Sequence, residues 1–276
     1  MGADFSYDPV TALDEASATG ETAAIFADIR QTMGIPLLTS IWRGLAGIGT
    51  SLPKVWALAK PIYLSGLPDV ALARVIARTR LPMPSPLAPT QLACVGIGPR
   101  DLDNIRAIVF AYNRSNGLNL AALAALVTPP GKEQAKASPR ISAPPWPPLR
   151  PLLPREGIDD NTWNLIRHVN AFGASGIDAS VATLWRHLAH WPGLLALAYT
   201  AFAPLQASGT ITAAAAQVVT LAKEEGARMA HLRPATLDLP REAHDTLADY
   251  VNQPPHVSRM VTLGHALAQW LTFDGR

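Results

Sequence analysis

Hydrophobic residues recur at three- and four-residue spacing along most of the chain, which is the period of an amphipathic helix. Alternating runs of β-branched or aromatic residues, which would indicate strands, are scarce. The pattern therefore predicts an all-α fold. The expected helices span residues 21–33, 37–48, 53–65, 68–80, 101–127, 160–172, 179–190, 193–206, 210–225, 240–252 and 256–272.

A proline-rich segment separates these helices into two groups. Residues 129–154 contain nine prolines, which lack an amide donor and disfavour helix at the preceding residue. We therefore expect an extended linker that lies across the surface with Trp146 as an anchor. The expected segments are an N-terminal extension (1–19), helical repeat 1 (20–128), the linker (129–156) and helical repeat 2 (157–276).

The two helical groups resemble each other in sequence. IWRGLA at 41–46 matches LWRHLA at 184–189, and LPKVWALA at 52–59 matches WPGLLALA at 191–198. The spacing between the matches is about 140 residues, and an internal duplication is the simplest account of it. We therefore predict two tandem pseudo-symmetric repeats with the largest cleft between them, where ligand sites prefer to form.

Composition excludes several classes of function. With 23 Lys plus Arg against 21 Asp plus Glu, and no basic block, the chain lacks the charge pattern of nucleic-acid binding. The single cysteine, Cys94, cannot form an internal disulfide, which favours a cytoplasmic location. Residues 187–222 carry no charged side chain, but prolines and a Ser-Gly pair divide them into pieces too short to cross a bilayer. We expect no nucleic-acid partner and no membrane association.

Three asparagines interrupt the strongly apolar helix expected at 101–127. In FAYNRSNGLNLAAL they are Asn113, Asn116 and Asn119. Asparagine is a poor helix former, and burying an unpaired amide costs about 1–3 kcal/mol. Asn113 and Asn116 are three residues apart and share a helix face, whereas Asn119 is expected to be half-exposed. Either the first two serve a site, or all three form hydrogen bonds across the interface between the repeats.

From about residue 20 onward the chain resembles the group I (DL-2-haloacid) dehalogenases. The resemblance is carried, in this order, by DIRQTMGIPLLTSIWR, FAYNRSN, the proline-containing connection and LAHWPGLLALAYTAFAPL. It implies an all-α homodimer of two-repeat subunits with the active site between the repeats and no metal or organic cofactor. It also implies hydrolysis of small 2-haloalkanoic acids by direct attack of water on the α-carbon, without an enzyme ester.

Such a displacement needs a base, a polar group that aims the water, and an apolar pocket. The family's water-aiming asparagine corresponds to Asn116. Its catalytic aspartate lies seven residues before the Trp of a Trp-Pro pair, and this position is Leu184 here. Other placements of the loop give Val181, Ala182 or Thr183, and none of these residues can act as a base. Thr183 and Leu184 are therefore expected to line the pocket without supplying the base.

Two nearby residues are candidate bases, each with a structural alternative. His187 lies one turn after Leu184, but a histidine near a helix C-terminus also interacts well with the helix dipole. Asp178 precedes the expected helix at 179–190, where it could instead act as an N-cap. His187 and His190 lack a third ligand at motif spacing, so no metal site is predicted.

The remaining candidates would shape the pocket or bind the substrate carboxylate. Aromatic positions of the family's pocket appear here as Leu37 and Ser40, and Tyr250 is a candidate replacement phenol. Arg43 and Arg186 occupy equivalent places in the two repeats and could each bind a carboxylate bidentately, or form an ion pair between helices.

Two functions follow from this reading. The chain is either a hydrolase of small 2-haloalkanoic acids or a catalytically inactive or repurposed family member that binds a small apolar acid. An acidic or imidazole group close to Asn116 would favour the hydrolase. A wall of Leu184, Leu37 and Val181 without a titratable group would favour the binding protein.

Overall fold

A computed structural model describes residues 13, 15–143 and 145–272 of the chain. All regular elements among these residues are helical, which confirms the predicted all-α class. Most of the expected N-terminal extension, residues 1–12 and 14, lies outside the described residues. The α-helices are α1 (Gly20–Met33), α2 (Ser40–Ala46), α3 (Ser51–Leu64), α4 (Leu67–Arg78), α5 (Pro89–Cys94), α6 (Pro99–Val127), α7 (Asp160–Asn170), α8 (Thr183–His187), α9 (Pro192–Ala207), α10 (Thr210–Met229), α11 (Arg241–Asn252) and α12 (Arg259–Trp270).

Short helical turns complete the description. They are the 3-10 turns η2 (Glu15–Ser17), η3 (Arg155–Gly157), η4 (Leu188–His190) and η5 (Ala230–Leu232), and the π-turn η6 (Pro254–Ser258). Among the described residues, no single helix is long and apolar enough to cross a membrane, and α9 with α10 meets that criterion only as a pair bent by 80°.

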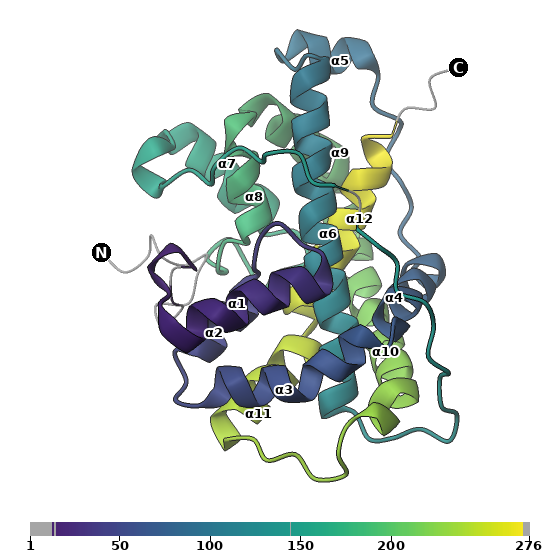
Figure 1. Ribbon diagram of the computed structural model, residues 1–276. Helices are drawn as coiled ribbons and strands as arrows, with labels where there is room; N and C mark the ends of the chain where they lie inside the picture. The colour runs from purple at the N-terminus through teal and green to yellow at the C-terminus, as the bar shows by residue number, and fades with distance from the viewer. Residues whose placement is uncertain (1–12, 14, 144, 273–276) are drawn as a thin grey trace.

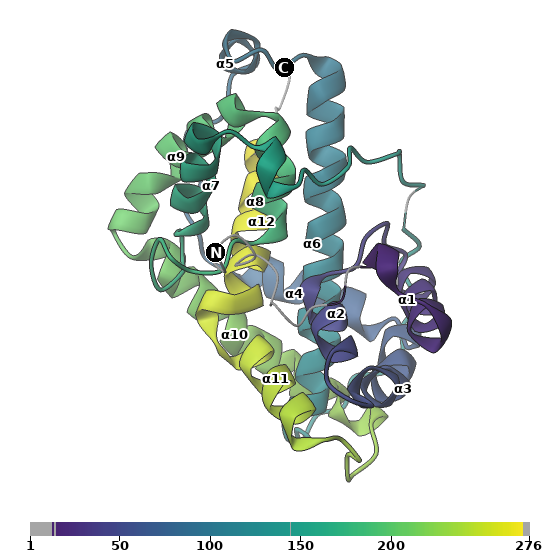
Figure 2. The ribbon, with the colours of Figure 1, turned by 90° about the vertical axis from the view of Figure 1, so that its left-hand side faces the viewer.

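The long helix α6 is the axis of the molecule (Figures 1 and 2). Helices α1 to α4 lie beside its C-terminal half, and α7 to α9 lie beside its N-terminal half. From residue 118 to residue 126 every side chain of α6 is buried, and this stretch packs in one hydrophobic core with α1 to α4, α10 and α11. Residues of the N-terminal half of α6, between 105 and 112, belong to the second core, with α7 to α9. The helix therefore contributes to both hydrophobic cores and joins them.

Close packing also extends α10 beyond its expected end at residue 225. The helix continues to Met229 because Gly226 packs directly on α6. A Cβ atom at Gly226 would lie 2.8 Å from the carbonyl carbon of Ala124, so only glycine allows this approach.

The order of elements recurs in the two halves. Helix α1 packs on α3 as α7 packs on α9, and each pair is followed by a helix that begins after a glycine in the left-handed region. These glycines, Gly66 and Gly209, both have φ of 73° and lie 143 residues apart. Pro61 inside α3 and Pro204 inside α9 show the same spacing. The recurrence agrees with the predicted duplication, which stays a hypothesis.

The segment predicted as a linker has no regular secondary structure in its described part. Residues 129–154 contain no helix or strand in their described part, and they run from the end of α6 back to α7 (Figure 1). The Trp146 indole Nε1 donates to the Gly34 carbonyl at 3.1 Å, and its ring packs on Phe110 with 5.4 Å between centroids. Trp146 thus anchors the linker.

The largest error of the sequence prediction concerns the helix expected at 179–190. Helix α8 begins only at Thr183, and the preceding segment is a loop held by the side-chain amide of Asn170. That amide donates from Nδ2 to the carbonyls of Ala179 and Ser180, and its Oδ1 accepts from the amide of Ala182. Because the side chain satisfies three backbone groups of the loop, the loop needs no helical hydrogen bonds.

Candidate active site

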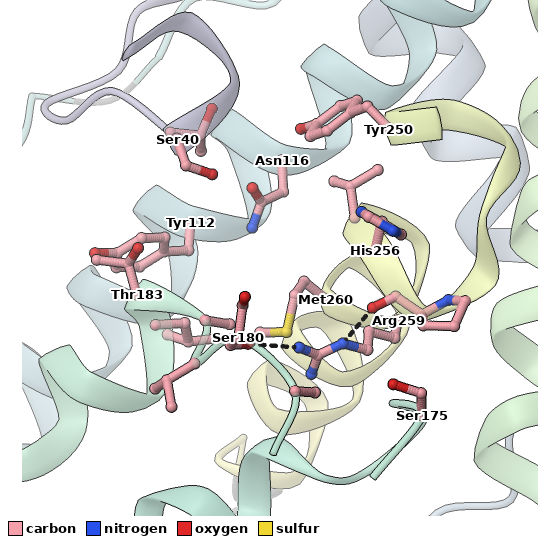
Figure 3. Close-up of a pocket in the computed structure, with 17 residues that line it drawn as sticks. Ser40, Tyr112, Asn116, Ser175, Ser180, Thr183, Tyr250, His256, Arg259 and Met260 are labelled. Atoms are coloured by element: carbon pink, nitrogen blue, oxygen red, sulfur yellow. Dashed lines mark hydrogen bonds between the residues drawn. The ribbon is translucent and has the colours of Figure 1, made fainter. Parts of the chain in front are cut away.

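A cavity of about 370 Å³ opens between the helices of the two halves (Figure 3). The beginning of α2 and the middle of α6 form its first wall, and the loop before α8, the end of α11, η6 and the start of α12 form its second. Its lining residues are Thr39, Ser40, Tyr112, Asn116, Ser175, Ala179, Ser180, Val181, Ala182, Thr183, Leu184, Tyr250, Pro255, His256, Val257, Arg259 and Met260.

Seven of the residues singled out in the sequence meet in this cavity: Ser40, Asn116, Val181, Ala182, Thr183, Leu184 and Tyr250. Asn116 is half-buried, and its amide projects from α6 toward the interior of the cavity (Figure 3). Ser40 and Thr183 are the first residues of α2 and α8 and lie 143 residues apart. Two helix starts at the spacing of the predicted repeat thus face the same cavity.

Tyr250 contributes a buried hydroxyl to the cavity wall. Burial raises the pKa of Tyr250 above its ordinary value, so the phenol stays protonated at neutral pH. Asn119 and Thr39 lie near the hydroxyl, yet neither forms a hydrogen bond of standard geometry with it. The protonated phenol therefore lies in the cavity wall beside these two polar side chains.

Asn113 does not line the cavity, contrary to the prediction. Its Nδ2 donates to the Gly264 carbonyl on α12 at 2.9 Å. A Cβ atom at Gly264 would lie 2.1 Å from the Asn113 Oδ1, so the amide fills the place of a side chain on α12. Asn113 joins α6 to α12 and has a structural role.

Asn119 is fully buried, so the expectation of half-exposure was wrong. Its Oδ1 accepts from the Trp42 indole Nε1 at 3.0 Å and from the Tyr63 hydroxyl at 2.8 Å, and its Nδ2 donates to Thr39 Oγ1 at 2.6 Å. These partners lie 56 to 80 residues away in the sequence. The structure therefore pairs the amide through contacts that the local sequence pattern does not reveal.

His187 lies behind the cavity wall and not in the cavity. Its Nε2 donates to the Arg150 carbonyl at 2.5 Å, because a carbonyl can only accept. Its Nδ1, 3.2 Å from the Tyr112 hydroxyl, therefore accepts from that phenol. Burial lowers the pKa of His187, which keeps the ring neutral. With both nitrogens occupied, His187 positions Tyr112 and cannot take a proton from water in the cavity.

Asp178 is neither a base nor an N-cap. Its side chain is 88% exposed and accepts from Arg167 Nη2 at 2.5 Å. It is not a lining residue of the cavity, and α8 begins five residues later at Thr183. Both predictions for Asp178 are therefore wrong, because the Asn170 amide holds this loop in a non-helical form.

The two predicted arginines and Leu37 also lie outside the cavity lining. Arg186 is buried and donates from Nε to the Leu153 carbonyl of the linker at 2.5 Å. It follows Leu184 by two residues, and side chains two apart on a helix do not face the same way. Arg43 is half-buried on α2, and Leu37 packs against the hydrophobic core of the second half.

Arg259 is the first site residue that sequence reasoning missed. Its side chain is 4% exposed, and its guanidinium donates to the carbonyls of Pro255 (2.6 Å) and Asn170 (2.9 Å). Nη2 also lies 3.1 Å from the Asn170 Oδ1 and 3.4 Å from the Ser180 carbonyl. No carboxylate among the described residues forms an ion pair with it. Burial lowers the pKa of Arg259 to about 10, so the group remains a cation at neutral pH.

The sequence did hold a signal for Arg259. It is the only Asp, Glu, Lys or Arg in the expected helix at 256–272. A single charged side chain in an apolar helix is rarely buried unless a hydrogen-bond partner or counter-ion pairs with it. A buried cation that meets only neutral oxygens attracts an anion to the cavity.

His256 is the second missed residue. Its backbone leaves the helical region, with φ of −88° and ψ of −128°, in the π-turn between α11 and α12. Figure 3 shows its imidazole at the cavity, between Tyr250 and Met260. Partial burial lowers the pKa of His256, and the Asp249 carboxylate opposes this effect. The preceding Pro254-Pro255 pair was the sequence signal for a break at this point.

The chemical character of the cavity follows from these residues. Its described lining contains one guanidinium, one imidazole, two phenols and one amide, but no carboxylate. Leu184, Val181 and Met260 add an apolar surface. Among the described residues, no three His, Cys, Asp or Glu side chains gather in a way that could hold a metal ion. The arrangement can hold a small anion beside an amide that orients water.

Comparisons with known proteins agree with this description. No protein-family model matches the chain. A 2-haloacid dehalogenase described as configuration-inverting, from Alcaligenes xylosoxydans xylosoxydans, is 23% identical over 221 residues, which cover 77% of this chain and 75% of that protein.

Solved structures share the fold at 14% sequence identity. A D-2-haloacid dehalogenase mutant superposes with a TM-score of 0.74 over 95% of both chains. A complex of such a mutant with D-2-CPA has a TM-score of 0.69 over 94% of this chain and 93% of the other. A complex of D-2-haloacid dehalogenase with L-LA has a TM-score of 0.68 over 94% of both chains.

Proposed function

We propose that the chain, which resembles 2-haloacid dehalogenases in sequence and in fold, binds small 2-haloalkanoic acids in the cavity and hydrolyses them by direct attack of water on the α-carbon. One arrangement supports this proposal above all. The cavity brings the amide of Asn116 together with a buried cation, Arg259, for which the described residues supply no counter-ion.

Arg259 would hold the carboxylate end of the acid mainly through its charge. At least three of its five N–H groups already donate to protein oxygens, so little bidentate capacity remains. The buried charge is nevertheless poorly screened, and a carboxylate beside it relieves the cost of an isolated cation. The volume of about 370 Å³ lies at the small end of ligand pockets, as expected for a short acid.

The α-carbon end would lie between Asn116 and the apolar wall. The amide oxygen of Asn116 accepts one hydrogen of the attacking water and aims its lone pair. Leu184, Val181 and Met260 keep further water away from the carbon that is attacked. Tyr250, whose phenol stays protonated, completes the lining on the side of α11.

The apolar wall formed by Leu184, Val181 and Met260 also favours a second function, binding of an acid without hydrolysis. Leu184, at the position of the family's aspartate, is 1% exposed, and no described lining residue is a carboxylate. A protein that binds a small apolar acid without turnover would need only Arg259 and the apolar surface. Halide release separates the two functions, because both bind the acid and only the hydrolase frees halide.

The test is halide release from D- and L-2-chloropropionate and from 2-bromopropionate, with binding followed by calorimetry. We expect wild-type protein to bind and to release halide, and Asn116→Ala to lose about 10²-fold in kcat because the water is no longer aimed. Asn104→Ala is the control, since Asn104 lies on the same helix outside the cavity and its side chain donates to the Arg100 carbonyl one turn earlier. Binding without halide release would favour the binding protein, and no binding would contradict both functions.

We also propose that the reaction uses no metal or organic cofactor and that the chain acts as a homodimer. Both statements rest on the family resemblance alone. Halide release after dialysis against a chelator tests the first, and the mass measured by light scattering during size-exclusion chromatography tests the second.

A further inference from the structure

We propose that His256 is the general base that replaces the carboxylate missing at Leu184. This inference rests on the proposed function, because a base is needed only where water attacks a bound acid. Among the described lining residues, His256 is the one side chain that can take a proton at neutral pH. Arg259 is a cation, and the phenols of Tyr112 and Tyr250 are already protonated.

The ring of His256 is free to accept a proton. Neither of its nitrogens has a hydrogen-bond partner in the described part of the chain, whereas both nitrogens of His187 are occupied. Figure 3 shows the imidazole of His256 and the amide of Asn116 at the same cavity. A water between the two side chains would meet an amide oxygen on one side and a ring nitrogen on the other.

The turn that carries His256 is fixed by Arg259. The guanidinium Nε donates to the Pro255 carbonyl, directly before His256, at 2.6 Å. The same guanidinium holds Asn170, whose amide in turn holds the loop at Ala179 and Ser180. One buried cation therefore holds both the turn that carries the base and the neighbouring loop of the same wall, which meets the requirement that a base be held in a fixed place.

The titratable groups around His256 favour its action as a general base. The titratable groups around it are Asp249 and Tyr250 on α11, Arg259 on α12 and Tyr112 on α6. Helix α10, which also packs against η6, has no titratable residue before Lys223. Partial burial and Arg259 keep the imidazole neutral in the resting state, and the exposed Asp249 carboxylate stabilises the imidazolium once it forms.

The step balances as follows. The water oxygen forms a bond to the α-carbon while the carbon–halogen bond breaks and halide leaves with its electron pair. One water proton passes to the His256 ring, and the other stays on the new hydroxyl, which Asn116 orients. The product is a 2-hydroxy acid with inverted configuration. Because His256 is exposed at one edge, the imidazolium returns its proton to solvent.

The experiment compares wild type, His256→Gln and His244→Gln in full-length protein. His244 is an exposed histidine on α11 outside the cavity and is the matched control. We expect His256→Gln to lower kcat for 2-bromopropionate by about 10² to 10⁴-fold, with Kd for the acid within about threefold of wild type. The acid limb of the wild-type kcat–pH profile should be absent from the residual rate of the variant.

Chemical rescue adds a readout that a structural role would not move. Added imidazole should restore part of the rate of His256→Ala and leave His244→Gln unchanged. The base assignment is overturned if His256→Gln keeps kcat within threefold of wild type while wild type releases halide, and the proposed function then stands. If wild type binds the acid but frees no halide, the hydrolytic function and the base both fall.

Discussion

The two walls of the cavity come from similar successions of helices but differ in chemistry. The first wall offers only neutral polar groups, such as Ser40, Tyr112 and Asn116. The second wall supplies the cation Arg259 and the imidazole of His256, together with most of the apolar surface. The similar order of helices therefore explains how the two walls are built. The cation and the imidazole, in contrast, lie in the second wall only.

This asymmetry is informative because the predicted duplication pairs residues of the two walls at a common spacing. Ser40 and Thr183, 143 residues apart, each begin a helix and each offer a hydroxyl to the cavity. Asn116 and Arg259 are also 143 residues apart, yet one is an amide on an unbroken helix and the other is a cation beside a π-turn. The break between α11 and α12, for which α6 has no counterpart, is where the reactive groups gather.

Removal of the charge from the second wall should have the largest effect. Arg259→Met leaves the carbonyls of Pro255 and Asn170 without their donor, so we expect the free energy of unfolding to fall by about 3 kcal/mol. Binding of a 2-haloalkanoic acid should weaken by about 10²-fold or more, since a buried charge pair is worth several kcal/mol when one partner is lost. Denaturant unfolding and calorimetry measure the two effects.

Arg259→Lys separates charge from geometry. Lysine keeps the cation but cannot reach all of the carbonyls, so it should bind the acid more tightly than Arg259→Met while losing comparable stability. Equal loss of binding in both variants would show that Arg259 acts only by holding the loop and the turn in place.

A carboxylate at the position of Leu184 should produce the next largest change. Leu184→Asp places a second base in the cavity at the start of α8, and we expect kcat for halide release to rise by about tenfold or more. Burial of the new charge should lower the free energy of unfolding by about 2 to 4 kcal/mol. Leu184→Asn is the matched control, because it brings the same shape without a base. If both variants release halide at the wild-type rate, Leu184 does not face the water.

The helices were predictable because each buries an apolar stripe that can be read from spacing alone. Helices α1, α3 and α9 begin and end within two residues of their expected limits. The loop before α8 was not predictable, because its backbone is satisfied by the amide of Asn170, a residue of another helix. A pattern of hydrophobic positions carries no information about such a partner.

Only those site residues that lie in segments covered by the family's sequence motifs were predictable. Asn116 and Leu184 came from aligned segments, and the structure places both in the cavity. His256 and Arg259 belong to a segment that the motifs do not cover. Arg259 forms contacts 79 to 89 residues away, so only the fold reveals them.

The smallest effect on the cavity should come from Asn119, which supports the first wall from behind. Asn119→Ala leaves the Trp42 indole and the Tyr63 hydroxyl buried without their acceptor, so we expect the free energy of unfolding to fall by about 3 kcal/mol. The Kd for the acid and kcat should stay within about threefold of wild type, because Asn119 itself is not a lining residue. Urea unfolding and halide release measure the two quantities. A loss of kcat as large as that of Asn116→Ala would mean that the polar side chains of the first wall act as one connected hydrogen-bond network. The first wall would then contribute more to catalysis than its uncharged side chains indicate.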